Sequence, residues 1–543
     1  MRRWAPTFLV AAVSFLTGGW LLQRAAPPAE IIGDATLFEE VLSHVEANFV
    51  DSLGDDQLFR KATDGLLDQL DDPYTVLLTG QDLRELTETT TGNYAGLGIQ
   101  IDVRDGWITV VAPLPESPAE RLGIQTGDQI VEVDGKSTEG WSSDRAVNTL
   151  RGPLGSKVRV VIRRPGISEL LPFEVERAAI HIRSVQAPIE LGSGTALVAL
   201  NPVSETSAAE LKREIEALRT RGLKSLILDL RGNPGGLLEQ GVEVSDLFLD
   251  QGQEVVATRG RTRGSTRTFS DRRPQAWPDL PIVVLVDEGS ASAAEIIAGA
   301  LQDHDRAVVV GTPTFGKGSV QTLFPLREGA MLKLTTARWY TPIGRSIQRD
   351  AGSAEDQIAQ VIREATGRPD TGAAAADTAG RPTFKTDGGR EVRGGGGIVP
   401  DLIVRRDTLT QSERAFVEAL GSDFAKYRDV LTTYALELKQ RGAIKQENFT
   451  VTPEMRAEVR RRLVAKGVQV DDARFNGAGR FVEEQISYEV ARYVFGREAE
   501  FRRRVGDDKQ VAKAVELLRQ AQTPKGLLEL TMSTAARGCE EGC

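Results

Sequence analysis

The chain has 543 residues, 40% of them hydrophobic and 27% charged, which is the composition of a globular protein too long for one core; we expect about three or four domains. Its formal net charge of -10 comes without a basic stripe, which argues against nucleic acid as a partner. Only two cysteines, Cys539 and Cys543, and three scattered histidines occur, so we expect no disulfide framework, no metal site and no cofactor.

The first 24 residues have the pattern of an export segment. Arg2 and Arg3 precede a run without charge over residues 4–23, which is long enough to cross ~30 Å of hydrocarbon. Residues 1–24 are therefore predicted to be a signal anchor or signal peptide. We favour the uncleaved anchor, because no clean small-x-small site precedes Arg24. The body is then expected in the periplasm or another extracytoplasmic space, anchored in the inner membrane.

Two different periodicities follow the export segment. Apolar residues at helical spacing over residues 36–72 predict a helical N-terminal domain, with bounds of 34–93. Residues 94–178 show short alternating strands separated by Gly and Pro turns, with helices expected near 118–122 and 144–150. This second segment is predicted to be a small, mainly β domain.

The largest core is predicted over residues 179–350. Apolar runs there alternate with helical stretches, as in a sheet covered by helices; the runs are residues 226–230, 282–286 and 307–310. An Ala/Gly/Thr/Asp-rich stretch at 351–390 predicts a low-complexity surface insert, and residues 391–407 are expected to complete the core.

The last part of the chain is predicted to be helical. Charges alternate with apolar residues at helical spacing over residues 408–535, which predicts a C-terminal domain, and residues 536–543 are expected to be a flexible tail. The periodicity leaves its role open: these helices could form a homo-oligomer or dock an adaptor.

A serine lies where a strand is expected to end and a helix to begin, in Ser290-Ala-Ser-Ala-Ala-Glu. Ser292 and Glu295 have the spacing of a capping box, which is a common structural feature. The same place suits a nucleophile, because a helix N-terminus offers free N–H groups to the negative charge that develops on an attacked carbonyl oxygen. This segment alone leaves both interpretations open.

A serine nucleophile needs a base. His304 is expected on the far side of the following helix, which leaves Lys317, after the next strand along the chain. A lysine acts as a base near neutral pH when burial lowers its pKa from ~10.4 toward ~7. Gln321 could fix the direction of the amine's hydrogen bonds without adding a charge that would raise this pKa.

The lysine segment also resembles a phosphate-binding loop. Gly311-x-x-x-x-Gly-Lys follows a strand, but Gly318 stands where a Ser or Thr should hold magnesium. We therefore set nucleotide binding aside.

Two glycine turns offer backbone N–H groups. Gly235 and Gly236, in Arg231-Gly-Asn-Pro-Gly-Gly, leave room for a close approach to an oxyanion. In the β domain, the loop at 96–99 precedes a strand and can present N–H groups to a terminal carboxylate, while the strand edge accepts a peptide. Each turn alone is a common structural feature.

Together, residues 36–405 resemble the carboxyl-terminal processing proteases, also called tail-specific proteases, of the serine-lysine type with a PDZ domain. The segments that carry the resemblance fall in order along the chain: Gly96-Leu-Gly-Ile to Gly127-Asp-Gln-Ile, Arg231-Gly-Asn-Pro-Gly-Gly, Ser290-Ala-Ser-Ala-Ala-Glu-Ile, Gly316-Lys-Gly-Ser-Val-Gln, Tyr340-Thr-Pro-Ile-Gly-Arg and Gly397-Ile-Val-Pro-Asp.

The resemblance implies a multidomain α/β protein: a helical lead-in, a PDZ-like β domain, a crotonase-like α/β protease core and a helical C-terminal extension. It implies a serine endopeptidase that recognises exported proteins by free C-terminal tails. The residues that it assigns are the nucleophile Ser292, the base Lys317, the lysine-orienting Gln321, oxyanion donors at Ala293 and at Gly235 or Gly236, and the peptide-binding Gly96, Leu97, Gly98 and Ile99. Arg151, near the end of the PDZ-like domain, could couple tail binding to the active site, and a solvated arginine is the alternative interpretation.

Two alternatives remain. A PDZ and protease-like scaffold without activity would keep the fold and lose the site. An acyl-transfer or hydratase enzyme on the related crotonase-like sheet would need a coenzyme-binding feature, and the sequence shows none.

Overall fold

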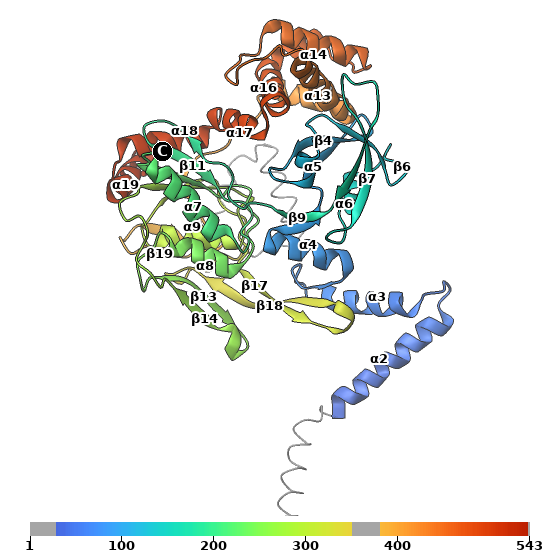
Figure 1. Cartoon of the computed structure of the whole chain (residues 1–543). Helices are drawn as coiled ribbons and strands as arrows, with labels where there is room; N and C mark the ends of the chain where they lie inside the picture. Colours follow the sequence, from blue (N-terminus) through green and yellow to red (C-terminus); the bar gives the residue numbers. More distant parts are fainter. Residues whose placement is uncertain (1–28, 350–380, 541–543) are drawn as a thin grey trace, which may run out of the picture. The chain divides into compact units, whose positions relative to one another are not determined.

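The computed structural model describes residues 29–349 and 381–540 (Figure 1). The predicted export segment and most of the predicted insert lie outside these ranges. No helix within them is long and apolar enough to cross a bilayer. The described residues belong to two compact units: residues up to 79 with 323–334, and 80–322 with the rest of the chain.

The first unit is small and mainly helical. It contains α2 (Ala29–Asn48) and α3 (Asp55–Asp68), in the region where helical periodicity is predicted, followed by β1 (Val76–Leu78). Strand β1 pairs antiparallel with the start of β18 (Met331–Tyr340), with Val76 opposite Lys333. The first unit thus includes residues more than 250 positions apart in the chain, which periodicity cannot indicate.

The second unit begins with α4 (Gly80–Thr91) and a two-stranded ribbon of β2 (Asn93–Gly96) and β9 (Ala178–His181). Between them lies a sheet of order β3-β4-β5-β7-β8, with β6 paired to β5 and β3 at one edge. Its strands are β3 (Ile99–Arg104), β4 (Trp107–Pro113), β5 (Gln129–Val133), β6 (Lys136–Ser137), β7 (Lys157–Arg163) and β8 (Leu171–Glu176). The helices α5 (Pro118–Arg121) and α6 (Ser143–Leu150) form where they are predicted.

The largest core surrounds a six-stranded sheet of order β10-β11-β12-β15-β16-β21, which is parallel from β11 onward. Its strands are β10 (Ile189–Glu190), β11 (Thr195–Ala199), β12 (Ser225–Asp229), β15 (Ile282–Val286), β16 (Val308–Gly311) and β21 (Leu402–Ile403). The central strands are buried on both faces, which explains their continuous apolar sequences.

Helices from different parts of the chain cover the two faces of this sheet (Figure 1). One face packs on α7 (Ser207–Thr220), α8 (Leu238–Asp246) and α9 (Ala293–Asp303). The other packs on α18 (Lys509–Gln520) and α19 (Pro524–Glu540). Helices α18 and α19 are therefore a layer of this largest core, and α19 occupies part of the range expected to be a tail.

A separate helical core precedes these two helices. It is formed by α12 (Gln411–Leu420), α13 (Phe424–Gln440), α14 (Pro453–Ala465), α15 (Asp472–Gly477) and α16 (Gly479–Phe495), and α17 (Arg497–Gly506) connects it to α18. The predicted single C-terminal domain thus contributes to two cores, because its common helical periodicity does not reveal which surface each helix covers.

Short antiparallel strands complete the structure. The sheet that contains β18 has the order β1-β18-β13-β14, with β17 (Ser319–Pro325) on β18, β13 (Glu254–Gly260) and β14 (Arg267–Ser270). A hairpin of β19 (Thr383–Lys385) and β20 (Glu391–Arg393) starts inside the range expected to be a low-complexity insert. Single 3-10 turns lie at Arg263–Ser265, Arg327–Gly329 and Gly421–Asp423. The predicted multidomain α/β class is confirmed.

Candidate active site

Three loops that carry predicted site residues leave the same edge of the central sheet. Strands β12, β15 and β16 are parallel neighbours, with Asp229 paired to Leu285 and Val286 to Gly311. The glycine turn follows β12, the serine turn follows β15, and the lysine loop follows β16. Since the carboxyl ends of adjacent parallel strands meet at one edge, the fold brings these segments together.

The serine turn has a strained backbone. Ser292 immediately precedes α9 and has φ 52° and ψ -116°, a combination that non-glycine residues rarely adopt. Such a conformation persists only where the surroundings enforce it. The partly buried Ser292 is therefore held in a sharp turn from strand to helix.

The buried carboxylate of Glu295 enforces this turn. Its Oε2 accepts the N–H of Ser292 at 2.8 Å and the N–H of Lys317 at 2.9 Å. Its Oε1 accepts the N–H of Gly316 at 2.7 Å and the hydroxyl of Thr314 at 2.5 Å. Burial raises the pKa of Glu295, while these donors oppose the shift. One side chain thus joins the serine turn to the lysine loop; its spacing from Ser292 predicted only a capping contact.

The glycine turn lies directly against the serine turn. A Cβ atom at Gly235 would lie 2.6 Å from the carbonyl oxygen of Ala291 and 2.8 Å from Cβ of Ser292. A Cβ atom at Gly236 would lie 1.8 Å from the carbonyl oxygen of Val203. Both positions therefore need glycine: Gly235 packs against the serine turn, and Gly236, the next residue, packs against the backbone of Val203.

The predicted oxyanion donors differ in their hydrogen bonds. The N–H of Gly235 donates to Oδ1 of Asn233 at 2.8 Å. Within the described ranges, the N–H groups of Gly236 and Ala293 form no hydrogen bond. Of the two glycines left open by the sequence, Gly236 is thus the one with a donor available in this conformation.

The lysine loop is held by its backbone. The carbonyl of Lys317 accepts the indole N–H of Trp339 at 3.0 Å, and the carbonyl of Gly316 accepts the N–H of Arg349 at 3.0 Å. Lys317 is partly buried, as its predicted role as a base requires. Gln321, on β17, donates from Nε2 to the hydroxyls of Ser319 at 3.0 Å and Thr335 at 3.1 Å. Its orienting role toward the amine stays a prediction.

The residue pair at the other end of α9 is structural. Asp303 is fully buried and pairs with the fully buried Arg345. His304 follows the last turn of this 11-residue helix, about 18 Å along the axis from Ser292, and contacts Asp387 at 2.7 Å. This position excludes His304 as the base for Ser292.

The predicted peptide-binding loop precedes the edge strand β3. A Cβ atom at Gly98 would lie 2.3 Å from Cβ of Ser117, and Leu97 is buried. Ile99 opens β3, whose outer edge is not paired within its sheet. This arrangement suits the addition of a peptide as a further strand.

Arg151 lies beside this loop. It ends α6, its guanidinium carbon stands 4.8 Å from the ring centre of Tyr94, and it pairs with Glu88 of α4. A Cβ atom at Gly96 would lie 3.8 Å from Cγ of Arg151. Arg151 therefore connects the peptide-binding loop to α4, and the predicted gating role stays open.

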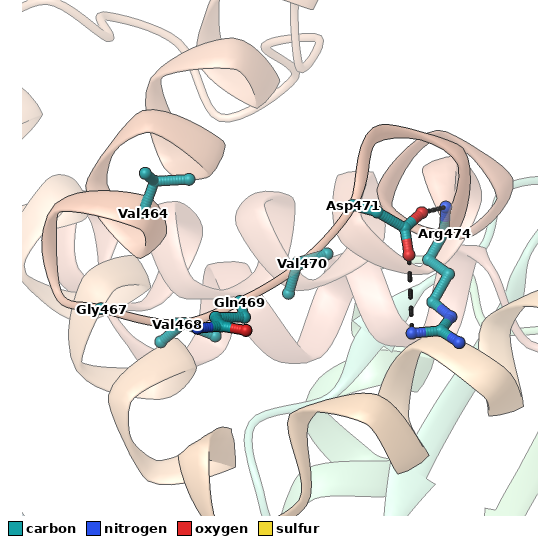
Figure 2. Close-up of a pocket in the computed structure, with 7 residues that line it drawn as sticks. All are labelled: Val464, Gly467, Val468, Gln469, Val470, Asp471 and Arg474. Carbon is teal, nitrogen blue, oxygen red and sulfur yellow. Dashed lines mark hydrogen bonds and ion pairs between the residues drawn. The ribbon is translucent and has the colours of Figure 1, made fainter.

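A pocket of about 570 Å³ in the C-terminal helices contains none of the predicted site residues (Figure 2). It is lined by Val464, Gly467, Val468, Gln469, Val470, Asp471 and Arg474. Asp471 accepts the N–H of Arg474 at 2.8 Å and caps α15, so its carboxylate has a structural role. In the two described ranges, no three His, Cys, Asp or Glu side chains gather as a metal site.

Comparisons with known proteins agree on one family. Residues 194–358 match the model of peptidase family S41, and residues 109–164 match a PDZ domain. A carboxy-terminal-processing protease of Bartonella bacilliformis is 38% identical over 315 residues, covering 57% of this chain and 72% of that protein. The carboxy-terminal processing protease CtpA of Bacillus subtilis is 36% identical over 358 residues, covering 64% and 76%.

Solved structures with similarity carry related names. The photosystem II D1 C-terminal processing protease is 31% identical, with a TM-score of 0.33 over 56% of this chain and 83% of that one. A PDZ domain of the carboxy-terminal protease of Vibrio cholerae, solved with a peptide, is 24% identical, with a TM-score of 0.16 over 16% of this chain and 98% of that one.

The sequence relatives decide the classification, because more than two thirds of each is matched at over 30% identity. The chain is a serine-type peptidase that belongs to peptidase family S41, the carboxy-terminal processing proteases.

Proposed function

We propose that this peptidase cleaves proteins captured by their carboxyl-terminal tails, with Ser292 as nucleophile and Lys317 as its base. The observation that carries the proposal is the shared oxygen of Glu295, which accepts the N–H of Ser292 at 2.8 Å and of Lys317 at 2.9 Å. A structural capping box would need only the first of these bonds. The second fixes the lysine loop relative to the nucleophile.

The reaction follows from these positions. Lys317 takes the hydroxyl proton of Ser292 while the serine oxygen attacks the peptide carbonyl. The N–H groups of Gly236 and Ala293 stabilise the negative charge on the tetrahedral oxygen. The protonated Lys317 then gives this proton to the leaving amine, whose loss leaves an acyl group on Ser292. The neutral lysine next takes a proton from water, which attacks the acyl group and releases it.

Substrate capture is assigned to the PDZ domain. The loop at 96–99 faces a terminal carboxylate with backbone N–H groups, and the tail pairs with the edge of β3. Strand pairing uses the main chain, so we expect selection of a free carboxyl end and of a few side chains near it.

The proposed substrates are exported proteins. This part of the proposal is supported by the charge-free run at 4–23, which lies outside the described residues, and by the basic residues before it. A reporter fused after residue 24 tests it: we expect protease-accessible reporter outside the cytoplasm, retained with the membrane fraction. Cytoplasmic reporter contradicts this location without affecting the catalytic assignment.

The catalytic assignment is tested with an unfolded protein that carries a free apolar C-terminus. We compare the chain from residue 29 onward with its Ser292→Ala and Lys317→Ala variants, expecting at least about a 1,000-fold loss of cleavage in each. Circular dichroism checks that the variants fold. A substrate with an amidated C-terminus is the matched control for tail capture, and we expect a higher KM for it.

The outcomes separate the functions. Unchanged cleavage by either variant means that the site lies elsewhere. If the folded wild type cuts no tail-bearing substrate, the inactive scaffold becomes the better interpretation, and binding of the tail peptide is then the remaining function.

A further inference from the structure

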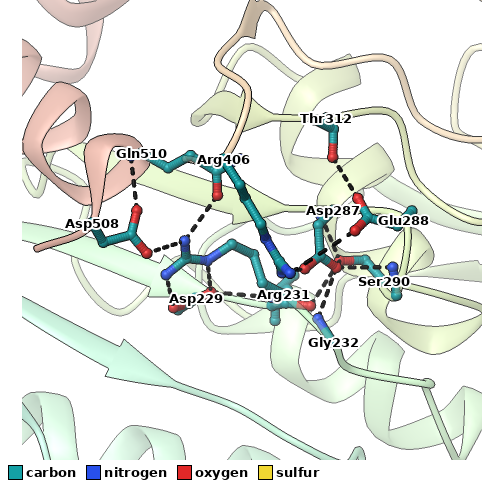
Figure 3. A network of polar contacts seen from close by, with 12 residues as sticks. Asp229, Arg231, Gly232, Asp287, Glu288, Ser290, Thr312, Arg406, Asp508 and Gln510 are labelled. Carbon is teal, nitrogen blue, oxygen red and sulfur yellow. Dashed lines mark hydrogen bonds and ion pairs between the residues drawn. The ribbon is translucent and has the colours of Figure 1, made fainter. Parts of the chain in front are cut away.

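Arg231 connects the glycine turn of the active site to the distant end of the chain (Figure 3). Its side chain is 11% exposed. Nε and Nη2 donate to the two carboxylate oxygens of Asp229, at 2.8 and 2.7 Å. Nη1 donates to Oδ2 of Asp508 at 2.5 Å and to Oε1 of Gln510 at 2.8 Å. The residue at the start of the turn is therefore held by β12 on one side and by α18 on the other.

The two carboxylate oxygens of Asp508 have different partners. Its Oδ1 accepts the N–H groups of Gln510 at 2.8 Å and Val511 at 3.2 Å, which caps α18, while Oδ2 accepts from Arg231. Gln510 is fully buried, and its Nε2 donates to the carbonyl of Val404 at 2.7 Å. The contacts to Arg231 therefore come from groups whose own positions are fixed.

The charge of Arg231 makes these contacts necessary. Burial alone would lower the pKa of its guanidinium, but Asp229 and Asp508 outweigh this effect and raise the pKa. The group stays charged in a mostly buried place, where an unpaired charge is costly. Without Asp508, moving the guanidinium toward water would lower the cost of its buried charge, and this movement would shift the backbone of Arg231.

The backbone of Arg231 leads directly into the glycine turn. The N–H of Gly232 donates to Oδ1 of Asp287 at 2.8 Å, and the carbonyl of Asn233 accepts the N–H of Ala291 at 2.9 Å. Asp287 also pairs with Arg406, in the segment after β21 (Figure 3). Movement at Arg231 therefore reaches both the glycine turn and the serine turn.

We propose that Asp508 and Gln510 are positioning residues of the peptidase: through Arg231 they hold residues 232–236 where Gly236 can donate its N–H to the oxyanion. The helical extension then completes the active site as well as covering the sheet. This inference rests on the proposed Ser292 chemistry and assigns the C-terminal helices a role in it.

The expected effect is on the transition state. An oxyanion donor stabilises charge only where it is already in place, and its loss costs about 100- to 1,000-fold in turnover. A loosened turn keeps the donor but not its position, so we expect a smaller loss, about 10-fold in kcat. KM is expected to change little, because the tail binds at the PDZ domain.

The first variant is Asp508→Ser. Serine is as good a helix N-cap as aspartate, so α18 keeps its cap, but its side chain is too short to reach Arg231. Asp508→Asn keeps the cap and the length without the charge, and we expect an intermediate kcat.

The matched control is Glu516→Gln on the same helix, whose Oε2 contacts the exposed end of Lys513 at 2.9 Å. This control is expected to match the wild type.

The second readout is affinity for a peptide aldehyde that forms a tetrahedral adduct with Ser292. We expect Asp508→Ser to weaken this inhibitor by the same factor of about 10 as kcat, while the affinity for a free tail peptide stays unchanged. Folded fraction is measured for each variant and used to correct both values.

The results separate this inference from the catalytic assignment. Wild-type kcat and aldehyde affinity in Asp508→Ser overturn the positioning role and leave the serine-lysine site standing. A loss that disappears after correction for folded fraction also overturns it, because Asp508 is then only structural. If Ser292→Ala cuts as well as the wild type, both proposals fail together.

Discussion

At the residue scale, Glu295 shows what sequence spacing can and cannot reveal. Ser292 and Glu295 are three positions apart, so their capping contact follows from local geometry. The contacts of the same carboxylate with Gly316 and Lys317 join residues more than 20 positions apart, and they depend on the pairing of β15 with β16. The resemblance indicated Ser292 and Lys317 as the proposed nucleophile and base, but no local pattern indicated the group that connects their backbones.

Glu295→Gln tests this connection. All four groups that face the carboxylate are donors, so a glutamine NH₂ group would oppose two of them. We expect a loss of about 2–3 kcal/mol in the free energy of unfolding, since buried donors lose their acceptor. We also expect kcat to fall at least about 10-fold with little change in KM, because the backbones of Ser292 and Lys317 lose the carboxylate that holds both of them. Urea unfolding and steady-state kinetics measure the two effects.

The matched control is Glu413→Gln. Glu413 is also a buried glutamate in a capping box, and it accepts the N–H of Thr410 at 2.7 Å, but it belongs to α12 in the helical core. The Glu413→Gln variant is expected to be less stable than the wild type and to have the same kcat. Equal kcat in the two variants would mean that Glu295 only stabilises the fold.

At the element scale, the sequence indicated where the strands lie better than it indicated which helices pack on them. The run at 282–286 coincides with β15, and its unbroken apolar sequence implies that both faces are covered. Helix α9 follows directly and covers one face. The other face is covered by α18 and α19, more than 200 positions later, and helical periodicity is the same whether a helix packs on a sheet or on other helices.

This packing predicts different consequences for two buried leucines. Leu517 of α18 contacts the sheet, whereas Leu463 of α14 belongs to the helical core; their exposures are 1% and 0%. Each Leu→Ala change is expected to cost about 2–5 kcal/mol in its own core. Leu517→Ala should therefore lower the temperature at which peptidase activity is lost by several degrees more than Leu463→Ala does. Equal inactivation temperatures would contradict the assignment of α18 to the peptidase core.

At the scale of the second unit, the helical core also contacts the PDZ domain. Asp102 on β3 pairs with Arg428 of α13 at 3.0 Å, and Asp105 in the β3–β4 turn pairs with Lys466 at the end of α14. A Cβ atom at Gly127 would lie 2.4 Å from a methyl group of Leu436. The order of the domains was readable from the sequence. These contacts were not, because charged residues at helical spacing look the same on a solvated face as on one that pairs with another domain.

Lys466→Glu tests whether these charges hold the hairpin of β3 and β4 against the helical core. Burial and the nearby Asp105 raise the pKa of Asp429, so the neighbourhood of Asp105 already contains a second carboxyl group. A third acidic group replaces an attraction by a repulsion, and for partly exposed charges this amounts to about 1 kcal/mol, or roughly 5-fold in the opening equilibrium. Faster hydrogen exchange is therefore expected over β3 and β4, with the difference largest at low ionic strength.

Two further variants decide whether the effect is electrostatic. Adding Asp105→Asn to Lys466→Glu removes one of the repelling charges and keeps a residue that tolerates the φ of 47° at this turn, so exchange should slow again. Lys157→Glu, which disrupts an exposed pair with Glu174 inside the PDZ sheet, is the control and should leave β3 unchanged. If Lys466→Glu leaves exchange over β3 at the wild-type rate in low salt, apolar contacts such as that of Leu436 hold the hairpin instead. If it speeds exchange and Asp105→Asn restores it, the separate helical core of α12 to α16 also restrains the strand expected to bind the substrate tail.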